Sequence, residues 1–244
     1  MIGGFIITGN VAKPVVLRGI GPSLTSAGLP AASLLSDPVL ELHGASGALI
    51  LSNDNWKDSP QKNQIQGTIF EPTDDRESVI LATLPPAAYT VVLKGAKDTA
   101  GIGLVEVYDN NQAVDSELAN ISTRGFVQIG NEVMIGGFVL GGSNPTNIAV
   151  RALGPSLTSA GLSNVLADPT LELHNANGTI MISNDDWESD LVSAAELTAH
   201  GLALPDTKES GIFTSLAPPG QFTAIVAGKN GGIGIALVEI YNLK

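Results

Sequence analysis

The stretch that decides the fold is GPSLTSAGL, which runs from Gly21 to Leu29 and again, letter for letter, from Gly154 to Leu162. The interval between these two strings equals the interval between the two occurrences of MIGGF, which begin at Met1 and Met134. Unrelated segments do not share such a string by chance, so the chain contains two copies of one unit. A period this long indicates repetition of a whole domain, because solenoid repeats span only roughly 20–50 residues.

Matched motifs continue outward from GPSLTSAGL in the same order in both copies. They are DP-x-LELH from Asp37 and Asp168, SND-x-W from Ser52 and Ser183, a Glu-Ser pair at Glu77 and Glu209, and LVE-x-Y ending at Tyr108 and Tyr241. Small insertions fall between these blocks and mark loops. We therefore predict two domains, residues 1–112 and 118–244, with the polar run Asp109–Glu117 as the linker.

Short apolar runs bounded by Gly, Pro, Asn or Asp predict strands throughout each copy. In the first copy these are Ile2–Thr8, Pro14–Ile20, Val39–His43, Ala48–Ser52, Ser78–Leu84, Tyr89–Lys94 and Gly103–Tyr108. The alternation in VLELH places Leu40 and Leu42 inward. LTSAGL after Pro22 is expected to make at most one helical turn, and the best helix candidate is Asp190–His200, with Asp190 as its N-cap. The fold class is therefore all-β: two tandem β-sandwich (jelly-roll-like) domains with the same topology.

The segment Leu118–Val133 has no counterpart in the first copy, and within it Ile121–Ile129 reads as a strand. The first domain is therefore predicted to lack a strand that the second domain has. A sandwich without that strand exposes unpaired backbone groups, which favours strand addition from the linker or from a neighbouring molecule. If neighbouring molecules supply this strand to one another head to tail, the result is a filament.

The repeat also changes the interpretation of the apolar N-terminus. MIGGFIITG aligns with MIGGFVLGG inside the chain, so it is predicted to be a strand and not the core of a signal peptide. We accordingly expect that Met1 is not the start of a natural secreted precursor.

Charge and composition limit the classes of molecule that the chain is expected to bind. The chain carries 12 basic and 24 acidic residues, for a net charge of −12. Such a surface repels nucleic acid, and no apolar run is long enough for a membrane span. The sequence has no cysteine, which removes thiolate metal sites and cysteine nucleophiles. Calcium is a natural counter-ion for the acidic surface.

Candidate calcium ligands cluster in the SND-x-W turns and near the Glu-Ser pairs, where carboxylate and amide oxygens are dense. They are Asn53, Asp54, Asn55, Asp75 and Glu77 in the first copy, and Asn184, Asp185, Asp186 and Glu209 in the second. The competing interpretation is an Asx turn that bonds its own backbone and is capped by a packed tryptophan. No D-x-D-x-D-G loop is present to favour calcium.

Catalytic motifs are weak. Ser23 and Ser156 lie in GPSL and not in a G-x-S-x-G nucleophile elbow. The matched His43 and His174 are expected on the solvent side of their strands, so no enzyme is predicted. Arg18 and Arg151 stand in apolar strands and need acidic partners, for which Glu41/Glu172, Glu77/Glu209 and Glu106/Glu239 are the matched candidates.

Taken together, NISTRG, GGF, GPSL, DP-x-LEL, NDDW, PPG-x-F-T and LVE-x-Y resemble a repeat of large secreted or surface proteins of verrucomicrobial and related bacteria. The later motifs also resemble, more loosely, the bacterial pre-peptidase C-terminal domain. The resemblance implies an extracellular or cell-surface location and an accessory or structural role. It supplies no catalytic residues.

These observations predict a non-catalytic structural or adhesive tandem module that binds copies of itself or neighbouring repeats and is able to form filaments. The alternative is an accessory module that binds carbohydrate or another surface polymer. Its only evident stacking platforms are Trp56 and Trp187, in a chain with 5% aromatic residues. A hydrolase is a third, weaker reading.

Overall fold

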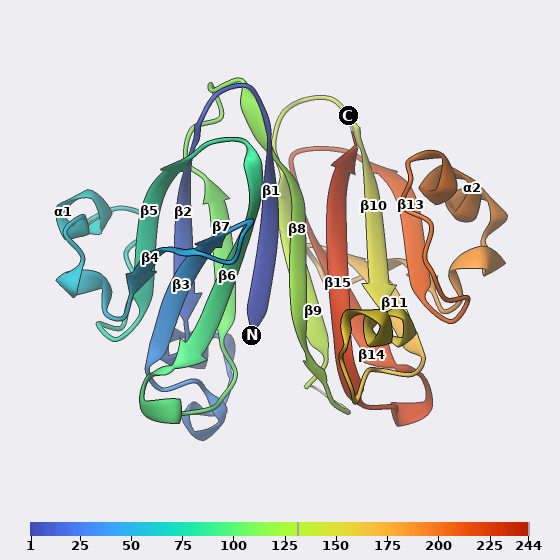
Figure 1. Cartoon of the computed structure of the whole chain (residues 1–244), viewed down its shortest axis with the longest axis horizontal. Coiled ribbons are helices and arrows are strands. Elements are labelled where there is room, and N and C mark those ends of the chain that lie inside the picture. The colour runs from blue at the N-terminus through green and yellow to red at the C-terminus, as the bar shows by residue number, and fades with distance from the viewer. Residues whose placement is uncertain (131, 244) are drawn as a thin grey trace. The chain divides into compact units, whose positions relative to one another are not determined.

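The computed structural model describes residues 1–130 and 132–243 and consists mainly of strands, which confirms the all-β class (Figure 1). The chain divides into two compact units, Met1–Ala119 and Asn120–Lys244. The division falls within strand β8 (Ser116–Val127), so the first residues of this strand belong to the first unit and the remainder to the second.

The first unit contains two antiparallel sheets, with strand orders β5-β2-β7 and β4-β3-β6-β1. Each predicted strand is present with ends that differ by at most two residues. The strands are β1 (Ile2–Gly9), β2 (Lys13–Ile20), β3 (Pro38–Gly44), β4 (Leu49–Asn53), β5 (Ser78–Leu84), β6 (Ala87–Gly95) and β7 (Leu104–Asp109).

The second unit repeats this arrangement and adds one strand. Its sheets have the orders β13-β10-β15-β8 and β12-β11-β14-β9, which match those of the first unit strand for strand apart from β8. The strands are β9 (Met134–Leu140), β10 (Thr146–Leu153), β11 (Pro169–Asn175), β12 (Ile180–Asn184), β13 (Ser210–Leu216), β14 (Gly220–Gly228) and β15 (Gly234–Leu243). The strand missing from the first unit is therefore the partner of β7.

Each unit is a sandwich because side chains from both of its sheets form one core. In the first unit the core combines Phe5 and Leu42 of one sheet with Leu17 and Ile80 of the other. The predicted alternation in β3 is confirmed, since Leu40 and Leu42 are fully buried and Glu41 is not. Period-two alternation buries one face of each strand and leaves the other for water or a covering segment.

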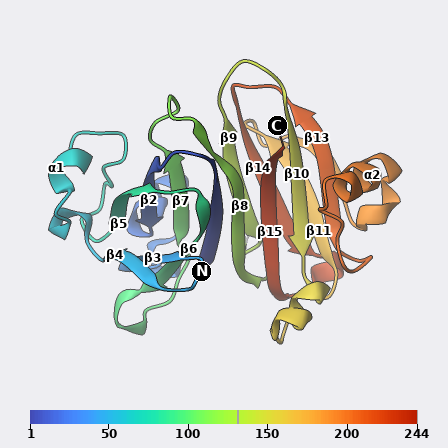
Figure 2. The ribbon, with the colours of Figure 1, turned by 45° about the horizontal axis from the view of Figure 1, so that its top comes forward.

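A helical segment covers the outer face of one sheet in each unit. In the first unit α1 (Lys62–Ile65) lies outside β5, and in the second α2 (Leu191–Ala199) lies outside β13 (Figure 2). The predicted helix is confirmed, since the Asp190 carboxylate accepts hydrogen bonds from the backbone N–H groups of Val192 and Ser193. No helix among the described residues is long and apolar enough to cross a membrane.

The predicted linker is shorter than the sequence indicated. Only residues 110–115 lie outside the strands, because β7 includes Asp109 and β8 begins at Ser116, five residues before the predicted start. Two Asx turns compact the connection: the Asp109 carboxylate accepts from the Asn111 N–H, and the Asn111 side chain accepts from the Ala113 N–H.

The repeated GPSLTSAGL string forms the same structure in both units. It makes a 3₁₀ helix at Pro22–Ala27 and again at Pro155–Ala160. Each helix ends at a glycine in the left-handed region, Gly28 with φ of 84° and Gly161 with φ of 79°. Glycine is favoured there because it carries no Cβ to clash in this conformation.

Candidate functional site

The two units differ most at one sheet edge. In the second unit, residues Gly234 to Tyr241 of β15 pair with Val127 to Asn120 of β8, in antiparallel register. In the first unit, the equivalent strand β7 pairs with β2. Among the described residues no strand pairs with its other side, so the backbone N–H and C=O groups that point away from β2 form an open sheet edge.

Burial of the side chains follows the same difference. Val238 and Ile240 of β15 are only 1% and 5% exposed, whereas their equivalents Val105 and Val107 are half-buried. Leu104, at the start of β7, is 40% exposed. The open edge therefore also exposes apolar side chains that β8 helps to cover in the second unit. The open edge, as used below, means β7 together with these side chains.

The Glu-Ser pair joins three motifs that occur in both repeats. In the second unit, Glu209 is fully buried and its Oε1 accepts from the N–H groups of Gly154 and Ser156, at 3.1 and 3.0 Å. The Ser156 hydroxyl donates to the same oxygen. Glu77 holds the N–H groups of Gly21 and Ser23 in the same way, at 3.0 and 2.8 Å. These carboxylates anchor the GPSL helices.

The serine of each pair connects two further turns. The Ser210 hydroxyl lies 2.6 Å from the Pro169 carbonyl oxygen and 2.8 Å from that of Asp185. Ser78 contacts the carbonyls of Pro38 and Asp54 in the first unit. The sequence shows that the Glu-Ser pair is repeated, but its role as a structural junction appears only when these turns are brought together.

The asparagines of the SND-x-W turns are also structural. Asn184 Oδ1 accepts from the Gly211 N–H at 2.9 Å, and its Nδ2 donates to the Asp186 carbonyl at 3.1 Å. Asn53 bonds Val79 and Asn55 in the same manner. In both repeats this asparagine therefore joins its own turn to a distant strand, and the tryptophan three residues later, Trp56 or Trp187, is buried.

An acidic cluster forms in the second unit from residues that are distant in the sequence. Carboxylate oxygens of Asp168, Asp185 and Asp186 lie within 4.8 Å of one another. The Lys229 ammonium lies 2.6 Å from Asp185 Oδ2 and 3.9 Å from Asp168 Oδ2. The hydrogen bond to Asp185 raises the pKa of Lys229, so the ammonium supplies the positive charge that this cluster requires.

Only two of the nine predicted calcium ligands belong to this cluster, namely Asp185 and Asp186. Asp168 was missed, although its repeated DP motif was visible in the sequence. Glu77 and Glu209 are committed to the GPSL backbone, and Asn53 and Asn184 to their own turns. The predicted ligand set therefore does not converge on one site, because the buried members already satisfy backbone donors.

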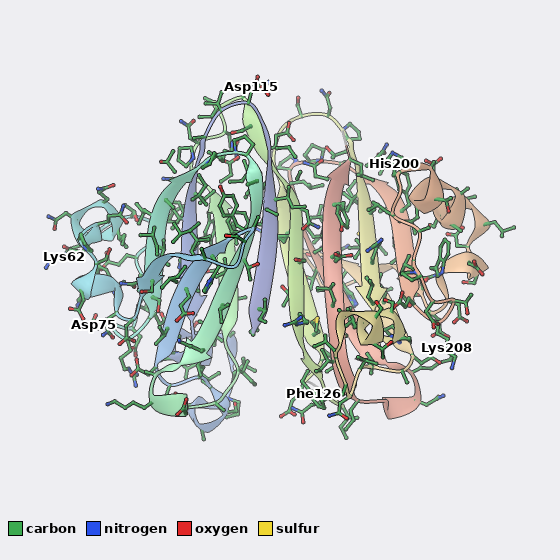
Figure 3. All side chains as sticks on the ribbon, viewed as in Figure 1. Lys62, Asp75, Asp115, Phe126, His200 and Lys208 are labelled. Carbon is green, nitrogen blue, oxygen red and sulfur yellow. The ribbon has the colours of Figure 1, made fainter. Side chains whose placement is uncertain are left out.

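The remaining candidates lie in the first unit. Asn55 donates to the Asp58 carboxylate at 3.2 Å, and Asp75, labelled in Figure 3, forms an exposed ion pair with Lys57 at 2.6 Å. Burial, followed by the charges of Asp37 and Asp58, raises the pKa of Asp54. Among the described residues of this unit, no three acidic side chains converge as they do around Asp185.

The matched arginines have the predicted kind of partner. Arg151 donates through Nε and Nη2 to Glu239 Oε2, at 2.9 and 2.6 Å, and Arg18 Nε lies 3.2 Å from Glu106 Oε2. Of the three matched glutamates, the one in LVE-x-Y is therefore the partner in both repeats. This ion pair joins the central strand of the sheet to β7 or β15 on its outer face.

Histidine and serine side chains have separate partners. His43 bonds the Glu41 carboxylate and the Gly47 carbonyl at 3.2 and 3.1 Å, and His174 has the equivalent partners. The hydroxyl of Ser23 donates to Glu77 Oε2 at 2.5 Å. A hydrolytic pair of Ser23 and His43 would need these side chains to meet each other, and their contacts lie elsewhere.

The tryptophans do not form stacking platforms. Trp56 is 2% exposed and Trp187 is 8% exposed, each beneath the helical segment that covers the outer face of its sheet. A sugar ring needs an open aromatic face to stack against. The expectation that these residues could receive carbohydrate is therefore wrong, because helical segments not anticipated as covers bury both rings.

The geometry defines a class, the all-β protein built from two sandwich repeats, one with an open sheet edge. No protein-family model and no curated protein matches the chain. Among solved structures, it is similar to the major capsid protein P2 of bacteriophage PM2, with 10% identity, a TM-score of 0.27, and 98% of this chain and 91% of that chain covered. A chain of the Sulfolobus turreted icosahedral virus structure gives 11% identity, a TM-score of 0.31, and coverage of 98% and 85%. At these scores the fold assignment rests on the sheets themselves.

Proposed function

We propose that this chain is a non-catalytic structural or adhesive module of the cell surface or extracellular space, which associates with copies of itself or neighbouring repeats by strand addition. The observation that carries the proposal is the open edge at β7, in a chain whose second unit has the equivalent edge covered by β8. An edge strand with free backbone groups and apolar neighbours is a template for another strand.

The remaining features agree with a structural role. Polar side chains that are matched between the repeats, among them Glu77, Glu209 and Arg151, have partners within their own unit and stabilise turns and strands. The extracellular setting rests on the resemblance of the motif order to secreted and surface repeats. A head-to-tail contact through the open edge that does not close on itself would extend into a filament.

Light scattering across a concentration series, followed by electron microscopy, tests the proposal. We expect the mass to rise with concentration, and the variant Leu104→Lys to shift this association at least tenfold toward the monomer, because a charge on an edge strand opposes pairing. The matched control is Leu191→Lys, which adds the same charge at a 79% exposed position in the second unit. A chain that stays monomeric at every concentration would contradict self-assembly.

A further inference from the structure

We infer that the open edge accepts a strand with the sequence pattern of Asn120–Val127, carried by another repeat of this type and entering antiparallel to β7. The inference rests on the proposed function and specifies the partner of the same site. It follows from the repeat itself, because the second unit shows which strand completes this fold and in which register it does so.

The strand that completes the second unit is defined residue by residue. Tyr241 of β15 lies opposite Asn120, and Gly234 lies opposite Val127. Transferred to the first unit through the aligned LVE-x-Y motifs, Tyr108 faces the Asn120 position and Leu104 faces the Arg124 position. Period-two alternation then directs the positions of Ile121, Thr123, Gly125 and Val127 toward the core.

The groups that β8 contacts in the second unit have equivalents in the first unit. Val127 is fully buried in the core of the second unit, and the Asn120 side chain donates to the Ile240 carbonyl at 3.1 Å. The equivalent acceptor in β7 is the Val107 carbonyl. Half-buried Val105 and Val107 pack on the first unit's core, as Leu118 does, and they supply the apolar surface that the inward residues of the incoming strand would cover.

Charge also favours this occupant. Residues 120–127 carry one basic side chain, Arg124, and no acidic one, whereas the whole chain has a net charge of −12. The carboxylates of the receiving strand, Glu106 and Asp109, are already paired with Arg18 and Lys13, so the attraction comes from the net charge of the whole chain. A cationic strand approaching an acidic chain is steered toward it, and this advantage falls with added salt.

The donor cannot be the chain's own β8 as the structure has it. All eight residues of Asn120–Val127 are already paired with β15. Moving this strand to the first unit would leave β15 unpaired on that side in exchange for covering β7. A strand of the same pattern from another repeat avoids this cost.

The first experiment uses a synthetic peptide with the sequence of Leu118–Ile129, labelled with a fluorophore and titrated with the full chain. We expect saturable one-to-one binding by anisotropy and at least tenfold slower amide exchange along β7. The matched control peptide carries Thr123→Pro, which removes a backbone donor and blocks the ladder. We expect its affinity to be at least tenfold lower.

Cross-linking tests the register. The chain contains no cysteine, so Leu104→Cys introduces a single thiol at an exposed position of β7. A short bis-maleimide should join it to a peptide carrying Arg124→Cys and not to one carrying Asn120→Cys, which would lie about 13 Å further along the strand. Equal cross-linking of the Arg124→Cys and Asn120→Cys peptides would overturn the register.

A fusion of the donor segment to the chain provides an independent test that needs no soluble peptide. Placing a second copy of residues 110–133 directly before Met1 should raise the melting temperature of the first unit by several degrees, and the same extension with Thr123→Pro should not. Absence of both peptide binding and fusion stabilisation overturns the identity of the donor strand, even where light scattering shows self-association. Peptide binding by a chain that stays monomeric supports the donor and overturns the self-assembly in the proposed function.

Discussion

At the residue scale, the most consequential side chains are the buried glutamates of the Glu-Ser pairs. Glu209 satisfies two backbone N–H groups and one hydroxyl inside the second unit, and Glu77 does so in the first. Buried donors that lose their acceptor each cost about 1–3 kcal/mol. A single carboxylate therefore stabilises the whole GPSL turn.

We accordingly predict that Glu209→Ala lowers the free energy of unfolding of the second unit by about 3 kcal/mol or more, because three donors lose their acceptor. Denaturant unfolding measures the effect. The matched control is Glu188→Ala, which removes an exposed carboxylate from the same unit and should change stability by less than about 0.5 kcal/mol. Equal effects of the two substitutions would show that Glu209 is not an anchor.

Alkaline titration tests the environment of the LVE-x-Y tyrosines. Burial raises the pKa of Tyr108 and of Tyr241 to about 12, and the neighbouring Glu106 and Glu239 add to the shift. A pKa raised in the folded state means that the stabilisation is complete below the unfolded value near 10 and is lost as the pH rises toward 12.

We therefore expect the tyrosinate absorbance of Tyr108 and Tyr241 in the native chain to appear near pH 12, together with loss of β-sheet circular dichroism. In denaturant the same side chains should titrate near pH 10. Native titration of all three tyrosines near pH 10, with the circular dichroism unchanged, would contradict the burial of these hydroxyl groups.

The acidic cluster leads to a prediction about calcium. The Lys229 ammonium lies 2.6 Å from Asp185 and competes with any cation for the same oxygens. Lys229→Met removes that charge, so we expect calorimetry to show calcium affinity at least tenfold higher than in the unsubstituted chain. Lys208→Met, at the exposed lysine labelled in Figure 3, is the control and should leave affinity unchanged. If the Lys229→Met chain showed no heat of binding at millimolar calcium, calcium binding at this cluster would be contradicted.

At the element scale, helix α2 illustrates how a local signal sets a boundary. Asp190 accepts from the backbone N–H groups of Val192 and Ser193 and from the Ser193 hydroxyl. These bonds lower the pKa of Asp190. The equivalent segment of the first unit has no such cap, and α1 is only four residues long.

We predict that Asp190→Ala destabilises the second unit by about 1 kcal/mol, the usual value of an N-cap. Asp190→Ser, which keeps a capping oxygen, should recover most of that loss. Chemical denaturation with Trp187 fluorescence reports on it, since Trp187 packs against Leu197 of the same helix. If the serine and alanine variants were equally destabilised, the contribution would not come from capping.

At this scale, the positions of the strands were more predictable than the pairing between them. Alternation such as that of Leu40 and Leu42 is a property of consecutive residues, so it marks a strand without reference to the rest of the chain. The pairing of β2 with both β5 and β7 joins residues far apart in the sequence. Such pairings come from the fold of the whole unit, and only the repeat made their equivalence visible beforehand.

At the scale of the whole molecule, the two units share one topology, but one sheet of the second unit has a strand that the first unit lacks. The second unit closes its sheet with β8, whereas the first leaves β7 as an edge with half-buried valines. Apolar area left exposed to water forgoes roughly 25 cal/mol per Å² of stabilisation. The first unit should therefore be the less stable of the two.

Fluorine labelling measures this difference directly, because the chain has two tryptophans and each unit contains one, Trp56 and Trp187. With 5-fluorotryptophan in place of tryptophan, we expect two ¹⁹F resonances that unfold at different denaturant concentrations, with the Trp56 signal lost first. Trp56→Phe assigns the resonances. Coincident loss of both signals would mean that the open edge does not weaken the first unit.

The sequence by itself determined the duplication, the strands and the capped helix, because each is encoded by neighbouring residues or by the alignment of one copy with the other. Tertiary structure alone decided which carboxylates meet. Asp168 joins Asp185 because β11 and β12 are paired, and Glu209 reaches Gly154 across the unit. It also decided that the tryptophans are buried. Burial and convergence depend on segments distant in the chain, and no local pattern carries that information.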